Sequence, residues 1–141
     1  MKNTGMDSYY RDLIVSRLID TGRDTRFTLR AYEFVYLIFA VLEKSSLNTE
    51  YGFSAKDVVQ TSEKMAVALY GPIAEFVLAD MGIKSANDIG AIIGNLVDLD
   101  IFVKDGFYGN DDFAEISKKP LFSKAQFKPL DIENLKIFED S

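Results

Sequence analysis

The sequence predicts a mainly all-α fold. A single five-helix domain is expected over residues 1–116, with a small β-hairpin near 101–108 that makes its second half winged-helix-like. A Pro-containing apolar tail follows over 117–141. Three observations predict this fold. Apolar residues recur at helical spacing in five stretches, the period changes after Asp98, and 141 residues that are 48% hydrophobic are enough to bury one core.

The first two helices are expected over residues 8–21 and 28–44. In the first, Gly22 follows the apolar residues as a stop signal. Its apolar positions are Tyr10, Leu13, Ile14 and Leu18. The second helix is apolar on most of its faces, which is typical of a helix buried at the centre of a domain.

The third and fourth helices are separated by Gly71-Pro72. Ser54 is a good N-cap for a helix over 54–69, and Asp57 lies at the position where a capping box places its acid. Pro72 suits the first position of the fourth helix, over 72–81, and Gly82 suits the left-handed position after its end. The residues expected to face inward are Ile73, Phe76, Val77 and Met81.

The fifth helix has the most regular apolar stripe. Ser85 and Asp88 are spaced to cap its start. The stripe consists of Ile89, Ile92, Ile93, Leu96 and Val97. Beyond it, residues 101–104 read as a strand, Asp105-Gly106 as a type I′ turn, and 107–108 as the returning strand.

The tail contains the tripeptide Lys-Pro-Leu twice, at 119–121 and 128–130. Its two prolines disfavour regular structure, but its apolar content is too high for a solvated linker. The apolar residues are Phe122, Phe127, Ile132, Leu135, Ile137 and Phe138. We expect the tail to pack on the domain; docking on a partner is the alternative.

The composition excludes several classes of chemistry. The chain has no cysteine and no histidine, so it offers no disulfide, thiolate nucleophile or imidazole base. The first fifteen residues lack an apolar signal core, and the longest apolar run, 34–42, is half a membrane span. These features predict a cytoplasmic protein without a cofactor and without a membrane partner.

The charge pattern argues against DNA reading by the fifth helix. Residues 84–116 carry two lysines against seven acids, and the outward face of the fifth helix has no Arg or Lys to neutralise phosphates. Small residues on that face instead offer a smooth strip for a neighbouring backbone, of the same chain or of a partner. The candidate interaction residues are Asp88, Gly90, Gly94 and Asn95.

Two other functions stay open. All five arginines lie in the first thirty residues, and Arg23, Arg26 and Arg30 are candidates for holding RNA phosphates, although pairing with acids of the same fold is favoured. A carboxylate enzyme ranks third. Its acids are Asp98, Asp100, Asp105, Asp111 and Asp112. Their spacing does not match a calcium loop, and no nucleotide or nucleophile motif occurs.

Five stretches between residues 11 and 116 resemble an uncharacterised bacterial family, the "Minf-type" proteins. Its pattern runs A-Y-x-F-V, F-G-P-x-A-x-x-V-L, W-G-I, D-x-G-x-x-V-x-N-L-V and D-F. The matching positions are Ala31, Tyr32, Phe34, Val35, Gly71, Pro72, Ala74, Val77, Leu78, Gly82, Ile83, Asp88, Gly90, Asn95, Leu96, Val97, Asp112 and Phe113. Tyr70, Met81 and Ile93 depart from it. The resemblance implies one small domain of unassigned activity and directs attention to Asp88, Gly90 and Asn95.

The sequence therefore favours a non-enzymatic protein–protein interaction module, with an unknown protein or a second copy as the partner. Nucleic-acid binding through the N-terminal arginines is the main alternative, and RNA is a better candidate than DNA. Helix capping, close helix packing and a bond to a neighbouring loop are the structural explanations for Asp88, Gly90 and Asn95 respectively.

Overall fold

The computed structural model describes residues 6–44, 54–102, 113 and 121–122, and every regular element within these ranges is helical. The predicted all-α class is therefore confirmed for this part of the chain. The elements are α1 (Ser8–Ile14), the π-helical turn η1 (Val15–Ile19), α2 (Leu29–Lys44), α3 (Ala55–Tyr70), the 3₁₀ turn η2 (Gly71–Ile73), α4 (Ala74–Asp80) and α5 (Ala86–Asp98).

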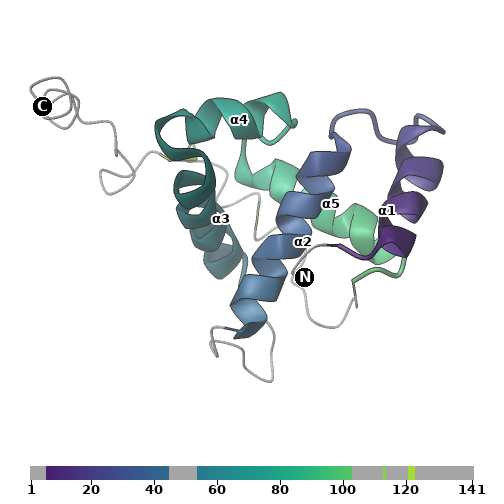
Figure 1. Cartoon of the computed structure of the whole chain (residues 1–141), viewed down its shortest axis with the longest axis horizontal. Helices are drawn as coiled ribbons and strands as arrows, with labels where there is room; N and C mark the ends of the chain where they lie inside the picture. Colours follow the sequence, from purple (N-terminus) through teal and green to yellow (C-terminus); the bar gives the residue numbers. More distant parts are fainter. Residues whose placement is uncertain (1–5, 45–53, 103–112, 114–120, 123–141) are drawn as a thin grey trace, which may run out of the picture.

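Helix α2 lies at the centre of the molecule, as its apolar faces predict. In Figure 1 it passes in front of α5, with α1 on one side and α3 on the other, and α4 lies across the top of α3. Tyr32, Val35 and Ile38 of α2 are completely buried. Their burial removes large apolar surfaces from water, which is the main force that holds the helices around α2.

The predicted helix caps are confirmed where they are local in sequence. The Ser54 hydroxyl accepts the N–H of Asp57 at 3.0 Å, and Ser85 and Asp88 form a reciprocal capping box at the start of α5. Gly82 has a φ of +99° after α4. Its N–H donates to the Ala79 carbonyl at 2.9 Å, and the next N–H, from Ile83, donates to the Leu78 carbonyl at 2.8 Å. This pair of bonds is the Schellman motif.

The first helix is correctly placed but changes character at its end. Helical structure runs through Ile19, and its last turn widens to the π form, closed by a 2.7 Å bond from the Asp20 N–H to the Val15 carbonyl. Apolar spacing near 3.6 residues cannot distinguish this wider turn from an α-helical one.

The predicted inward face of α4 is wrong at two of its four residues. Met81 is buried and Val77 is half-buried, but Ile73 and Phe76 point into solvent. Ala74 and Leu78 take the inward positions instead. The cause is the 3₁₀ turn at residues 71–73. The prediction counted 3.6 residues per turn from Pro72, whereas the 3₁₀ turn has three, so the residues after it face other directions than predicted.

The hairpin predicted near 101–108 is not supported. Asp100 adopts a φ of +62°, and the N–H of Ile101 donates to the Leu96 carbonyl at 2.9 Å, so these residues close the end of α5. Ile101 and Phe102 then form a bend, and the rest of the predicted hairpin lies outside the described residues. No strand occurs in the described ranges, and the winged-helix comparison has no support there.

Candidate interaction site

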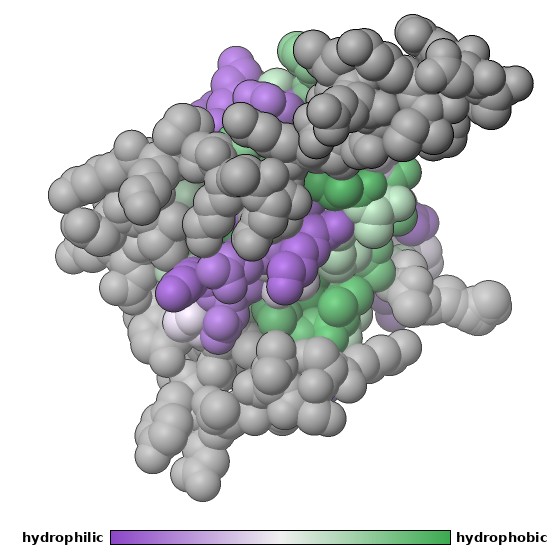
Figure 2. Space-filling model, turned by 90° about the vertical axis from the view of Figure 1, so that its left-hand side faces the viewer, coloured by the Kyte–Doolittle hydropathy of each residue, from purple (hydrophilic) through white to green (hydrophobic). Residues whose placement is uncertain are grey.

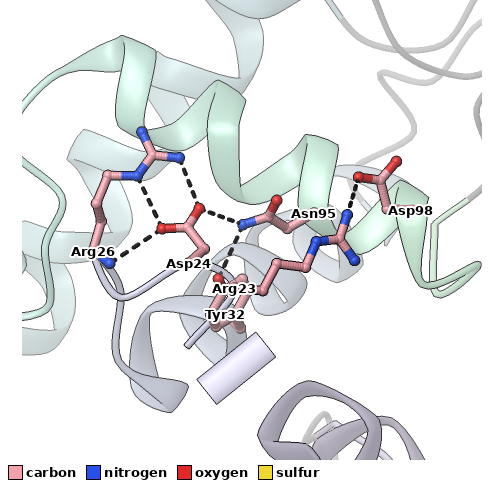
Figure 3. Close-up of polar contacts among 6 residues, drawn as sticks. All are labelled: Arg23, Asp24, Arg26, Tyr32, Asn95 and Asp98. Atoms are coloured by element: carbon pink, nitrogen blue, oxygen red, sulfur yellow. Dashed lines mark hydrogen bonds and ion pairs between the residues drawn. The ribbon is translucent and has the colours of Figure 1, made fainter. Parts of the chain in front are cut away.

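An arginine–carboxylate ion pair joins two residues within the loop before α2. The guanidinium of Arg26 donates to both carboxylate oxygens of Asp24, from Nε to Oδ1 at 2.9 Å and from Nη2 to Oδ2 at 2.7 Å. The backbone N–H of Arg26 also donates to Oδ1 at 3.1 Å. Figure 3 shows Asp24 held between Arg26 on one side and Asn95 on the other. This bidentate geometry is the strong form of an ion pair.

Asn95 joins this loop to α5. Its Nδ2 donates to Oδ2 of Asp24 at 2.9 Å and to the hydroxyl of Tyr32 at 3.1 Å, so both amide protons are used. The hydrogen bond from Arg26, assisted by the one from Asn95, holds the pKa of Asp24 well below its usual range. Burial raises the pKa of Tyr32 above its ordinary value. We call Asp24, Arg26, Tyr32 and Asn95 the loop–α5 network.

Two of the three arginines proposed from the sequence to bind RNA form ion pairs with acids of the same chain. Arg26 pairs with Asp24, and Nη2 of Arg23 donates to Oδ2 of Asp98 at 2.8 Å. Arg30 is exposed near the start of α2. The pair of Arg23 with Asp98 is exposed on both sides, and such surface pairs are weak, at roughly 0–1 kcal/mol, so RNA phosphates would compete for Arg23. The pairing nonetheless agrees with the structural explanation of the arginines.

The four candidate interaction residues have different surroundings. Asp88 caps α5 by accepting the N–H of Ser85 at 3.0 Å, and Asn95 belongs to the loop–α5 network. A Cβ on Gly90 would lie 3.0 Å from Cγ of Phe113, so a ring of the same chain covers that position. Gly94 is exposed, with open space where its Cβ would be. The strip on α5 is therefore covered at Gly90 and open at Gly94.

An exposed apolar surface lies elsewhere, at the junction of α3 and α4. Leu69, Ile73 and Phe76 are 54%, 57% and 73% exposed, and they are three of the five large hydrophobic residues exposed in the described chain. We call these three residues the apolar corner. Figure 2 looks onto the α3 side of the molecule and shows apolar side chains at the surface beside a polar group. The charged residues of α4 are two exposed acids, Glu75 and Asp80.

A small pocket beside α4 is lined in part by two residues of the tail. Leu121 is only 7% exposed and, with Phe122, lines a pocket whose other residues are Glu75, Ala79, Ile83 and Lys84. We call this pocket the Leu121 slot. The backbone N–H of Phe122 donates to Oε2 of Glu63 at 2.6 Å, and Glu63 on α3 is itself only 5% exposed. The predicted packing of the tail concerns mostly residues outside the described ranges.

The acids proposed for catalysis are not gathered in the described structure. Asp98 and Asp100 are both exposed, and Asp105, Asp111 and Asp112 lie outside the described residues. In the ranges the structure describes, no group of three or more metal-ligating side chains occurs. None of the helices there has the combined length and apolarity that a bilayer span requires.

Sequence reasoning missed both the apolar corner and the Leu121 slot. Ile73 and Phe76 carry an apolar signal that normally marks core, so nothing local distinguishes them from buried residues. The repeated Lys-Pro-Leu was visible in the sequence, but Glu63 is 59 residues away from Phe122 and gives no local sign of the bond.

Comparison of the chain with protein-family models, curated proteins and solved structures finds no match in any of the three. The resemblance to the "Minf-type" proteins therefore stays a prediction.

Proposed function

We propose that this protein is a non-enzymatic interaction module that binds a partner polypeptide through the apolar corner. The observation that carries the proposal is the exposure of Leu69, Ile73 and Phe76 within eight residues of chain. Single exposed apolar residues are ordinary, but neighbouring ones with a large aromatic among them are typical of interaction sites. Phe76 is the natural anchor, because aromatic residues dominate the binding energy of protein interfaces.

The charge around the corner defines the chemistry of the partner. Residues 65–83 contain two acids, Glu75 and Asp80, and no Lys or Arg. The whole chain also carries a net charge of −6. A partner segment that places Lys or Arg beside its apolar residues would match this surface and be steered towards it. The composition, which lacks cysteine, fits an encounter in the cytoplasm.

Copurification with substituted full-length chains tests the proposal. Phe76→Ala should lower capture of a defined protein by about thirtyfold, the effect of removing a 2 kcal/mol anchor. Because Phe76 is largely exposed, its removal should change the free energy of unfolding by only about 0.5 kcal/mol. Tyr9→Ala is the matched control, since Tyr9 is an exposed aromatic residue on α1.

The same experiment separates this proposal from RNA binding. Capture that survives nuclease, falls with Phe76→Ala and is unchanged by Tyr9→Ala supports the apolar corner. Capture lost with nuclease and with Arg30→Ala would move the assignment to the N-terminal arginines, whose binding should also weaken steeply with salt.

A further inference from the structure

We infer that the Leu121 slot binds a small organic zwitterion, in which an ammonium group and a carboxylate are joined by a short apolar chain. The inference goes beyond the proposed function and does not depend on it, because Leu69, Ile73 and Phe76 of the apolar corner do not line the slot. The class of ligand follows from the volume of the slot, from its apolar walls and from the two opposite charges that line it.

The volume and the walls of the slot suit a small molecule with an apolar body. The slot encloses about 160 Å³. An apolar cavity of roughly 150 Å³ accepts a molecule the size of benzene, so the slot suits a ligand of about six to eight non-hydrogen atoms. Four of its six lining residues are apolar: Ala79, Ile83, Leu121 and Phe122. Mostly apolar walls with a few polar groups are typical of small-molecule sites.

The other two lining residues carry opposite charges. Glu75 lies in the first turn of α4, and Lys84 follows the end of that helix. Both residues are exposed, and among the described residues neither side chain forms an ion pair or a hydrogen bond, with the other or with a third group. Glu75 is therefore available to bind an ammonium group, and Lys84 to bind a carboxylate.

The places of Glu75 and Lys84 favour a ligand whose two charges are far apart. A helix of seven residues is about 10 Å long, and α4 separates the two residues along the chain. Ala79 and Ile83 lie between them in sequence and supply apolar wall. A ligand with a charge at each end and an apolar chain in the middle would meet all of these groups at once.

The wall that the tail contributes is held in place by a buried carboxylate. Oε2 of Glu63, on α3, accepts the backbone N–H of Phe122 at 2.6 Å, and Glu63 is only 5% exposed. Phe122 has a φ of +64°, which bulky residues rarely adopt. Such conformations persist where the surrounding structure fixes them, and they concentrate at ligand-binding and active sites. A wall fixed in advance lowers the entropy cost of binding.

The probe that matches the slot is δ-aminovalerate, which carries an ammonium group and a carboxylate at opposite ends of an apolar chain. Valerate lacks the ammonium group, pentylamine lacks the carboxylate, and norvaline carries both on one carbon. NMR titration of the full chain, followed on its backbone amides, measures all four. We expect δ-aminovalerate to bind with a Kd on the order of millimolar. Each of the other three should bind at least about fivefold more weakly, the most that one exposed ion pair contributes.

Substitutions assign the two charges. Glu75→Gln should weaken the binding of δ-aminovalerate to the affinity of valerate, and Lys84→Gln should weaken it to that of pentylamine. Asp80→Asn and Lys56→Gln are the matched controls, because each removes the same charge from an exposed residue that does not line the slot. Both controls should leave the affinity within about twofold of the unsubstituted chain.

Amide shifts concentrated at Ala79, Ile83 and Lys84, together with this order of affinities, would support the inference. No binding of δ-aminovalerate, equal affinity for the four probes, or equal effects of Glu75→Gln and Asp80→Asn would overturn it. Shifts spread over the acidic surface of the chain, rather than at the slot, would also overturn it, because they would mark non-specific attraction of a cation.

Discussion

The side-chain amide of Asn95, on α5, donates a 2.9 Å hydrogen bond to the carboxylate of Asp24, 71 residues earlier in the chain. This bond joins the loop before α2 to α5, and the second amide proton reaches Tyr32 in the buried core. Asn95→Ala should therefore lower the free energy of unfolding by about 1–3 kcal/mol, since two polar groups lose a partner. Urea unfolding followed by circular dichroism measures this, and a change within the range of ordinary surface substitutions would contradict it.

The depressed pKa of Asp24 predicts a loss of stability in acid. In the unfolded chain this carboxyl titrates near its ordinary pKa of about 3.9, and in the folded chain it stays ionised to lower pH. Its contribution is complete above a pH of about 5 and declines as the pH falls below that, because the unfolded state takes up its proton first. The difference in unfolding free energy between the unsubstituted chain and Asp24→Asn should shrink between about pH 5 and 2. A difference for Asp24→Asn that stays flat over this pH range would mean that the pair with Arg26 does not stabilise the fold.

Gly94 and Gly90 form a matched pair on one helix. Gly94→Ala should raise the free energy of unfolding by about 1 kcal/mol, because alanine favours the helix and the new Cβ meets open space. At Gly90 the same gain is opposed by contact with the Phe113 ring, and overpacking costs about 1–3 kcal/mol, so Gly90→Ala should be destabilising. Equal effects at both positions would contradict the packing of Phe113. If a partner backbone lay on Gly94, Gly94→Ala would lower copurification of that partner while raising the free energy of unfolding.

Asp100 offers a test of how α5 ends. It holds a positive φ at the position where the Schellman motif normally has glycine. Asp100→Gly should therefore stabilise the protein by about 0.5–1 kcal/mol, whereas a strand beginning at Ile101 would be weakened by glycine beside it. Thermal unfolding distinguishes the two, and a lowered midpoint would favour the hairpin.

Local signals predicted most of the helix boundaries. Ser54, Ser85 and Gly82 act within four residues of the groups they bind, so the sequence alone identifies them as caps. The prediction of the inward face of α4 failed because that face depends on one 3₁₀ turn at Gly71. The prediction of a strand at Ile101 failed because an apolar residue after a polar break suits a strand and a Schellman motif equally well. Both errors are choices between conformations with the same apolar pattern.

The sites were harder to predict because they depend on distant residues. The sequence suggests a bond from Asn95 to a neighbouring loop, but nothing near Asn95 in the sequence identifies Asp24 as its partner. Phe113 over Gly90, and Glu63 against Phe122, are likewise contacts that only the folded chain brings together. Ile73 and Phe76 of the apolar corner are predicted to lie in the core because exposure cannot be read from side-chain type alone.

The most direct test of the interaction proposal is photo-crosslinking at position 76 in the cells that make the protein. Phe76 would be replaced by the photoreactive analogue p-benzoyl-phenylalanine, with the same replacement of Tyr9 as the control, since both side chains are exposed aromatics. The account predicts one defined protein adduct at position 76, absent at position 9, whose crosslinked peptide carries apolar residues beside Lys or Arg. Identical adducts at both positions, or none at position 76, would contradict it.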